Sequence, residues 1–203
     1  MTLYLIRHGE TELNAARVVQ FPETPLGARG KLQAAHLSDF LISRKIQKVL
    51  TSDYLRARMT AESIRHETGA ELLQIPMLRE RNFGHIRGKC YDDFEGVDIF
   101  AEDYSPPGGE SWEEFHQRVD RAWVIIQAHL EATEGNLAVV THGLVLRSLL
   151  DRLLDTSSQS LKDDLVLENT CVTEVQAAAP WRVVSLATTD HLDETSSAGG
   201  APV

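Results

Sequence analysis

The sequence predicts an α/β fold, namely a three-layer sandwich with a mostly parallel central sheet, helices on both faces and a lid-like insertion. Short apolar runs alternate along the chain with segments of helical periodicity, which is the pattern of βαβ units covered on both faces. One interval, residues 79–110, has no clear periodicity and is rich in glycine and proline. Structureless intervals of that length inside a domain are usually functional, so we expect this one to form a lid or cap.

The first half of the chain alternates short strands with longer helices. Residues 2–6 form an apolar run without helical period, which predicts a strand that is buried from the first residues. Leu32, Ala35, Phe40 and Leu41 recur among polar residues and predict a helix. The elements expected here are strands at 2–6, 48–51 and 71–75, with helices at 30–43 and 55–67.

The second half begins with the strongest helical signal. Ser111, with Glu114 three residues later, is a capping box, and apolar residues follow at helical spacing as far as Leu130. We expect a strand at 137–141, a helix at 144–154 and a hairpin of strands 171–175 and 181–187 about Pro180. We therefore expect a single domain over residues 1–192, followed by a Ser-, Gly- and Ala-rich tail, 193–203, that is disordered.

Composition excludes several classes of function. The chain of 203 residues has a formal net charge of −10 and a pI near 5.2, which disfavours nucleic acid and anionic membranes as partners. Cys90 and Cys171 have no zinc-type spacing and are expected to be reduced thiols. No apolar run approaches the roughly 18 residues of a membrane span, and no signal peptide is recognisable. We therefore expect a cytoplasmic protein, and the sequence leaves a homodimer open.

Three predicted strands run directly into chemically active residues. The first ends in Arg7-His8-Gly9-Glu10, the second precedes Arg56, and the fourth ends in His142-Gly143. Ligands of open α/β sheets bind beyond the carboxyl ends of the strands, so these side chains are expected to meet at one edge. Each glycine allows a close backbone approach to a ligand, and a helix that starts after Gly143 would direct free N–H groups to the same edge.

Two histidines with several arginines make a poor metal site and a good phosphate site. Arginine gives planar, permanently charged contacts to phosphoryl oxygens. A neutral imidazole can attack phosphorus and form a covalent intermediate, and nearby arginines keep it neutral by lowering its pKa. We therefore expect phosphoryl transfer without a metal or another cofactor.

These segments resemble, in order and over nearly the whole chain, the histidine phosphatase superfamily and specifically its phosphoglycerate-mutase-like branch. The matching segments are Leu5-Ile6-Arg7-His8-Gly9-Glu10-Thr11 with Asn14, Gly30 with Gln33-Ala34, Thr51-Ser52-Asp53 with Arg56-Ala57 and Thr60-Ala61, Glu80-Arg81-Asn82-Phe83-Gly84, Pro107-Gly108-Gly109-Glu110-Ser111 with Arg118, Val140-Thr141-His142-Gly143, Asn169 and Asp190-His191-Leu192.

The resemblance implies a role for each matched residue. His8 would be the nucleophile that becomes phosphohistidine. Arg7, Arg56 and His142 would bind the phosphoryl group, with the Gly143 amide and Asn14 as helpers. Glu80 would be the general acid for the leaving oxygen and then the base for water; Glu110 and Asp53 compete for this role. Glu10 is expected to be a structural hydrogen-bonding residue.

The sequence departs from the family pattern at three places. Gln20-Phe21 stands where relatives usually have Gln-Gly, Leu26-Gly27 where they have Leu-Thr, and Arg87-Gly88 where they often have Glu-Gly. Gln20 remains a candidate for substrate binding on the wall of the pocket. His85, which directly follows the Glu80 motif, is a further candidate contact to the substrate.

The expected activity is hydrolysis of a small phosphomonoester, such as a sugar phosphate, phosphoserine or α-ribazole phosphate. The resemblance also implies that cofactor-dependent mutases of the family have longer chains than this one. Acidic residues of the lid would repel bisphosphorylated ligands if they faced the pocket, although a solvated face is the favoured interpretation; they are Asp92, Asp93, Glu95, Asp98, Glu102 and Asp103. Alternatives are phosphoglycerate mutase-type transfer, a non-catalytic phosphate-binding regulatory module, and a metallohydrolase.

Overall fold

A single six-stranded sheet forms the middle of the protein. The computed structural model describes residues 1–159 and 165–192; the tail 193–203, predicted to be disordered, lies outside the described residues. The strands are β1 (Thr2–Arg7), β2 (Ile46–Thr51), β3 (Glu71–Gln74), β4 (Asn136–Thr141), β5 (Val172–Gln176) and β6 (Val183–Thr188). Their order is β3-β2-β4-β1-β5-β6. The first four are mutually parallel, while β5 and β6 are added in antiparallel pairs, so the predicted mostly parallel sheet is confirmed.

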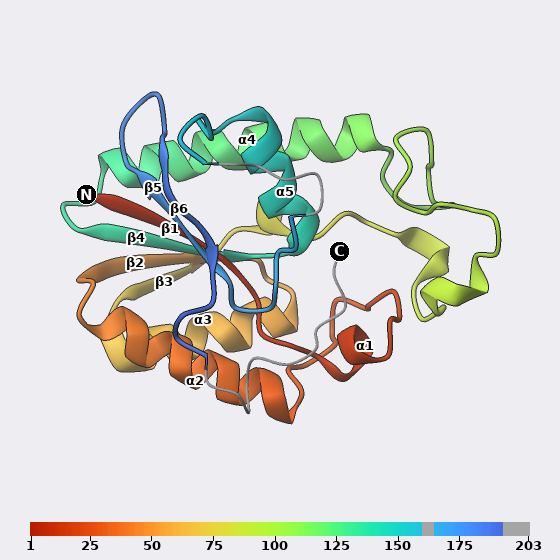
Figure 1. Ribbon diagram of the computed structural model, residues 1–203, viewed down its shortest axis with the longest axis horizontal. Helices are drawn as coiled ribbons and strands as arrows, with labels where there is room; N and C mark the ends of the chain where they lie inside the picture. Colours follow the sequence, from red (N-terminus) through yellow and green to blue (C-terminus); the bar gives the residue numbers. More distant parts are fainter. Residues whose placement is uncertain (160–164, 193–203) are drawn as a thin grey trace.

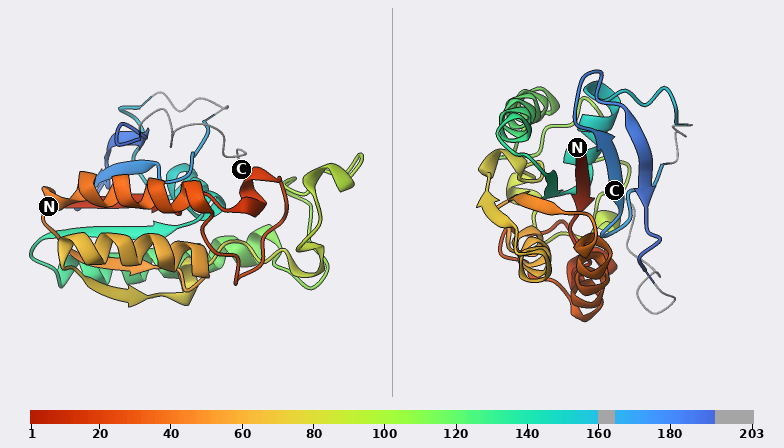
Figure 2. Two further views of the ribbon diagram at one scale, coloured as in Figure 1. Left: turned by 90° about the horizontal axis from the view of Figure 1, so that it is seen from below. Right: turned by 90° about the vertical axis from the view of Figure 1, so that its left-hand side faces the viewer.

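Two helices cover each face of this sheet (Figure 1). α2 (Ala28–Ile42) and α3 (Leu55–Thr68) pack on one face, and α4 (Trp112–Glu131) and α5 (Gly143–Arg152) on the other. The end-on view in Figure 2 shows the sheet between the two helical layers. The three-layer sandwich is thereby confirmed.

α4 shows why these residues form a packed helix. Its six buried apolar side chains lie at helical spacing and face the sheet: Phe115, Val119, Ala122, Trp123, Ile126 and Leu130. Full burial of one such side chain contributes about 1.5–3 kcal/mol. At its start the Ser111 hydroxyl accepts from the Glu114 amide, and Glu114 accepts from the Ser111 amide. A cap of this kind contributes about 1 kcal/mol.

Element boundaries differ from the expectation mainly at turns. A short helix, α1 (Glu12–Ala15), was not predicted because four residues are too few to show a period. α5 includes Gly143 and ends at Arg152 rather than at residue 154. β6 begins at Val183 rather than at residue 181, because Trp181 has a φ of 61° and still belongs to the turn.

The predicted lid, residues 79–110, has only short 3-10 turns: Gly84–Ile86 and Tyr91–Asp93. Phe83, Ile86 and Ile99 are buried and join the core under α4 and α5. The two ends of the lid pack closely at Gly84. A Cβ atom added to Gly84 would lie only 2.2 Å from the Pro107 carbonyl oxygen. Figure 1 shows the segment extending beyond the end of the sheet, and the six acidic residues between Asp92 and Asp103 are exposed.

Candidate active site

The ends of β1, β2 and β4 meet at one edge of the sheet. The His8 amide donates to the Thr141 carbonyl over 2.9 Å, and the Ser52 amide donates to the Val140 carbonyl over 3.0 Å. These bonds bring His8 and His142 together, with 5.1 Å between their ring centroids. His142 Nε2 lies 2.8 Å from the Ser52 hydroxyl. The parallel pairing of β1, β4 and β2 therefore places both histidines side by side.

Geometry fixes the tautomer of His8. Its Nδ1 lies 2.7 Å from the Gly9 carbonyl oxygen, which can only accept, so Nδ1 carries the proton. Nε2 accepts from Arg56 Nε over 3.1 Å and thus presents its lone pair. Burial, Arg56 and Arg7 hold the pKa of His8 well below its usual value. His8 is consequently a neutral imidazole with an outward lone pair, as nucleophilic attack requires.

Three buried arginines line a small cavity beside His8. Arg7 donates to the Leu167 carbonyl, and Arg56 donates to the Phe21 carbonyl over 3.0 Å. Burial lowers the pKa of Arg56 to about 10, which still leaves it charged at neutral pH. Among the described residues, Arg7 Nε and Arg81 Nη1 are buried donors without a hydrogen-bond partner. The inner cavity, about 30 Å³, is lined by Arg7, His8, Val19, Gln20, Tyr54, Arg56, Glu80, Arg81, Phe83, Arg87 and Tyr91.

The size and charge of this inner cavity suit a compact anion. One water needs roughly 10–15 Å³ of such space, so about 30 Å³ admits a group of only a few heavy atoms. Buried guanidinium groups with unused donors satisfy oxyanions best, because charge-assisted bonds are stronger than neutral ones. His142 Nδ1 is another buried atom without a partner among the described residues. The donor set therefore fits a phosphoryl group.

Glu80 is the carboxyl group nearest to this chemistry. It accepts from the Arg81 amide over 2.9 Å and, at the first turn of α5, from the Leu144 amide over 3.2 Å. Burial raises the pKa of Glu80, although both amides, Arg56 and Arg7 act in the opposite direction. A buried carboxyl with a raised pKa can carry a proton nearer to neutral pH than an exposed one.

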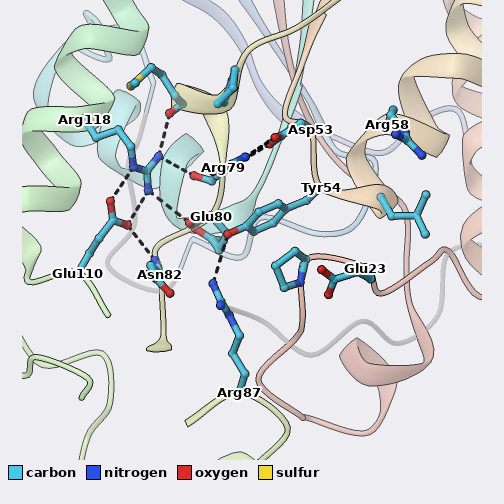
Figure 3. A pocket seen from close by; sticks show the side chains of 14 residues that line it. Glu23, Asp53, Tyr54, Arg58, Arg79, Glu80, Asn82, Arg87, Glu110 and Arg118 are labelled. Carbon is cyan, nitrogen blue, oxygen red and sulfur yellow. Dashed lines mark hydrogen bonds and ion pairs between the residues drawn. The ribbon is translucent and has the colours of Figure 1, made fainter. Parts of the chain in front are cut away.

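A larger outer cavity of about 720 Å³ adjoins the inner one. Tyr54, Glu80 and Arg87 line both cavities and so mark their boundary. Figure 3 shows Tyr54 and Glu80 near the centre of the outer cavity, with Arg87 approaching the Tyr54 hydroxyl. A phosphoryl group inside would leave its ester partner in the outer cavity, next to Glu80.

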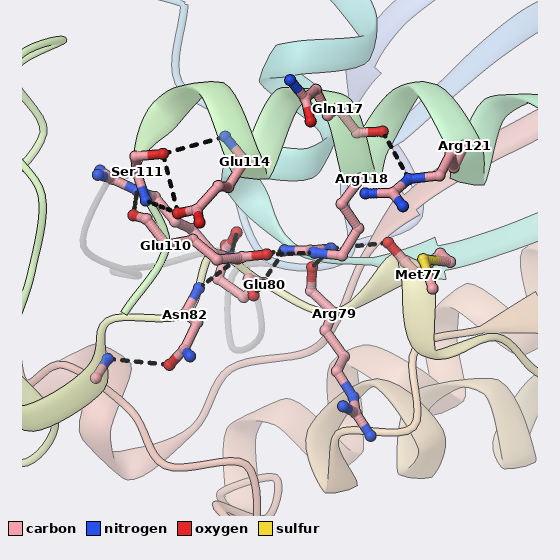
Figure 4. A network of polar contacts seen from close by, with 12 residues as sticks. Met77, Arg79, Glu80, Asn82, Glu110, Ser111, Glu114, Gln117, Arg118 and Arg121 are labelled. Carbon is pink, nitrogen blue, oxygen red and sulfur yellow. Dashed lines mark hydrogen bonds and ion pairs between the residues drawn. The ribbon is translucent and has the colours of Figure 1, made fainter. Parts of the chain in front are cut away.

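The competing carboxylates of the outer cavity are held by arginines. Asp53 forms a bidentate ion pair with Arg79, and Glu110 forms one with Arg118 at 2.7 and 2.8 Å. Arg118 also donates to the carbonyls of residues 77 and 79 (Figure 4). These contacts lower the pKa of both carboxyl groups. Asp53 and Glu110 are thus held as carboxylates, whereas the raised pKa of Glu80 favours its protonated form.

The remaining expected site residues differ in whether they reach a cavity. Gln20 lines the inner cavity, whereas Asn14 caps α1 through its bonds with Thr11 and lines neither cavity. Gly143 opens α5 behind His142. The expectation for His85 needs correction: this residue is exposed, packs against Gly108 on the lid, and lines neither cavity. The turn Gly84–Ile86 places its ring against Gly108 instead.

Sequence reasoning did not assign Ser52, Tyr54 or Arg87. Ser52 holds His142, and the Tyr54 ring contacts His142 with 5.4 Å between centroids. Their place immediately after β2 was the available signal, because three strand ends were already expected to meet there. For Arg87 the signal was its departure from the family pattern. Glu10, expected to be structural, forms an ion pair with Arg29.

The fold agrees with the comparison to known proteins. Residues 3–188 match the model of the histidine phosphatase superfamily (branch 1), and the chain belongs to this family. A probable phosphoglycerate mutase GpmB from Serratia proteamaculans (strain 568) is 32% identical over 210 residues, with 95% of each chain covered. Members of this kind include both mutases and phosphatases by name.

Solved structures show the same likeness. Bacillus stearothermophilus YhfR is 28% identical with a TM-score of 0.80, and the match covers 95% of this chain and 99% of that one. A putative alpha-ribazole-5'-P phosphatase from Escherichia coli is 27% identical with a TM-score of 0.79, covering 93% and 96%.

Residues 1–159 and 165–192 contain neither a membrane-spanning helix nor a cluster of metal-ligating side chains. No helix in this part of the chain combines the length and apolarity needed to cross a membrane. In the same residues, no group of three or more His, Cys, Asp or Glu side chains is arranged to hold a metal ion.

Proposed function

We propose that the protein is a phosphomonoesterase that hydrolyses a small phosphorylated metabolite through a phosphohistidine intermediate on His8. The observation that carries the proposal is the neutral, buried His8, whose Nδ1 proton is fixed on the Gly9 carbonyl and whose Nε2 lone pair meets Arg56 beside the inner cavity. A pure binding module needs neither such a nucleophile nor the buried carboxyl group of Glu80.

In the first step the phosphoryl group enters the inner cavity. Arg7, Arg56 and His142 bind its oxygens, and the N-terminal end of α5 adds its dipole. His8 Nε2 forms a bond to phosphorus while the ester P–O bond breaks, and the Arg56 donor turns from the lone pair to a phosphoryl oxygen. Glu80 gives its proton to the leaving alcohol.

In the second step water enters from the outer cavity. Glu80, now a carboxylate, takes a proton from this water as the water oxygen attacks phosphorus and the P–N bond breaks. Inorganic phosphate leaves, and both His8 and Glu80 return to their starting protonation states. The raised pKa of Glu80 supports this double use, because the group must both donate and accept a proton near neutral pH.

Water access favours hydrolysis over mutase-type transfer. Every residue from 88 to 109 is described, and none of them lines the outer cavity, so the distal lid does not close over it. The exposed lid carboxylates also line neither cavity, and repulsion of bisphosphates by them is not part of the support. The relative named phosphoglycerate mutase GpmB favours mutase activity as the second candidate.

A panel of phosphomonoesters, assayed for phosphate release beside a coupled mutase assay with 3-phosphoglycerate, tests the proposal. We expect phosphate release to exceed mutase turnover, to be unaffected by chelators, and to vanish in His8→Ala. Mutase turnover above phosphate release would favour the second candidate. Activity that is lost in chelator and restored by a divalent ion would support a metallohydrolase, and hydrolysis by His8→Ala at the wild-type rate would exclude His8 as the nucleophile.

A further inference from the structure

Arg87 lies on the boundary of the two cavities and differs in its contacts from Arg79 and Arg118 of the outer cavity. It lines both cavities, and within the described residues its guanidinium donates to a neutral group, the Tyr54 hydroxyl, over 3.3 Å. Arg79 and Arg118 form ion pairs with carboxylates. In residues 1–159 and 165–192 no carboxylate lies within ion-pair distance of Arg87. Most of its five N–H donors therefore remain available to a ligand.

The position of Arg87 matches the leaving group better than the phosphoryl group. Arg7, Arg56 and Arg81 already line the inner cavity around His8. Arg87 lies at the boundary together with Glu80, where the ester oxygen must sit when it receives the proton. A charge carried near that oxygen on the alcohol would therefore meet the Arg87 guanidinium.

The backbone beside Arg87 is held in place by its contacts, which favours a fixed position of the Arg87 side chain at the boundary of the two cavities. The amide of Gly88 donates to the Val19 carbonyl over 2.7 Å, and Gly88 has a φ of +82°. An added Cβ at Gly88 would lie 2.9 Å from the Phe21 ring. The Phe21 ring thus lies beside Gly88, the residue that follows Arg87, at this rim.

The charges facing Arg87 do not oppose an anion there. Asp53 and Glu110 are neutralised by their arginines, and Glu80 has a raised pKa. Glu23 lines the outer cavity but is exposed. Water screens such an exposed carboxylate strongly.

We propose that Arg87 binds a second anionic group, a carboxylate or a second phosphate, on the alcohol part of the phosphomonoester, and so selects doubly anionic substrates. Arginine suits both groups because its planar fork can bind two oxygens at once. The inference rests on the proposed function, since it places the phosphoryl group beside His8 and the alcohol beside Glu80.

Three ligands with the same three-carbon chain test it: glycerol 3-phosphate, 3-phosphoglycerate and glycerol 1,3-bisphosphate. Their dissociation constants are measured by calorimetry in the Glu80→Gln background, in which their cleavage is slowed, and phosphate release is measured in the active chain. The variants are Arg87→Gln, Arg87→Lys, Arg58→Gln and, as a matched control, Lys89→Gln, which removes an exposed charge that lines neither cavity.

We expect at least one doubly anionic ligand to bind roughly ten- to a hundredfold more tightly than glycerol 3-phosphate. The two such ligands distinguish a carboxylate from a phosphate as the second group. Arg87→Gln should bring the ratio close to one, Arg87→Lys should retain part of it, and Lys89→Gln should retain all of it. Arg87 is partly exposed at the rim, so its variants are expected to fold, and thermal denaturation checks this.

Equal binding of the three ligands by the parent chain would overturn the inference, as would a preference that survives Arg87→Gln. A preference that disappears only in Arg58→Gln would also overturn it, because the second anion would then lie on the far wall. An Arg87-dependent binding preference without phosphate release from any ligand would support the inference while contradicting the proposed function.

Discussion

Replacement of Glu80 by glutamine separates the two proton transfers of the proposed mechanism. Glutamine has nearly the same shape, but it cannot donate a carboxylic proton, and its amide nitrogen cannot accept from either the Arg81 or the Leu144 amide. Loss of a positioned general acid or base costs roughly 10²–10⁴ in rate. We therefore expect a fall of this size for alkyl phosphates, whose leaving oxygen needs the proton.

A nitrophenyl phosphate should behave differently, because nitrophenolate leaves without protonation. With Glu80→Gln, stopped-flow absorbance should show a rapid burst of about one nitrophenolate per active site. Slow turnover should follow, because the phosphohistidine is hydrolysed slowly without the general base. Glu95→Gln, which removes an exposed lid carboxylate, is the matched control and should keep the wild-type rates with both substrates. Equal losses with alkyl and nitrophenyl esters, without a burst, would refute the role of Glu80.

Three further predictions concern Arg56, the buried histidines and Gly30. Arg56→Lys should lower kcat/KM by roughly 10²–10³, because a point charge cannot serve both His8 and the phosphoryl oxygens; steady-state kinetics at the wild-type level would exclude this role. The lowered pKa values of His8 and His142 mean that the folded state binds fewer protons than the unfolded state below the usual value of 6.5, so the free energy of unfolding should decrease as the pH falls below 6.5. Urea titrations should show a weaker decrease in His8→Gln, and equal pH dependence would contradict the assignment. In Gly30→Ala the new Cβ would lie 1.9 Å from the Glu10 carbonyl oxygen, and this overpacking should cost about 1–3 kcal/mol, visible as a lower Tm; an unchanged Tm would show that the loop after His8 can move freely.

Much of the fold followed from periodicity. α4 was predictable because its apolar spacing persists over twenty residues and Ser111 marks its start. The strand order was not predictable, since the pairing of β4 between β1 and β2 depends on contacts between segments distant in sequence. α1 and the turn at Trp181 were missed because local hydrogen bonds and a positive φ, rather than a hydrophobic pattern, determine them.

Some residues of the candidate site could be predicted from the sequence and others could not. His8, Arg56 and His142 were expected together because parallel strands deliver their carboxyl ends to one edge, and the structure places them there. Glu80 came from the resemblance alone, since no local periodicity marks its segment. The direction of His85 could not be foreseen, because it is set by contacts between the two ends of the lid, at Gly84 and Gly108.

The phosphorylated state of His8 tests the central proposal most directly. Radiolabelled nitrophenyl phosphate, whose leaving group needs no proton, is mixed with the Glu80→Gln variant, in which breakdown of the intermediate should be slow, and the reaction is quenched in alkali. We predict label on the protein that is stable in alkali, labile in acid and located on the peptide containing His8, with none in a Glu80→Gln, His8→Gln double variant. Phosphate release from the wild-type chain with no labelled protein, or with label on another residue, would contradict the mechanism.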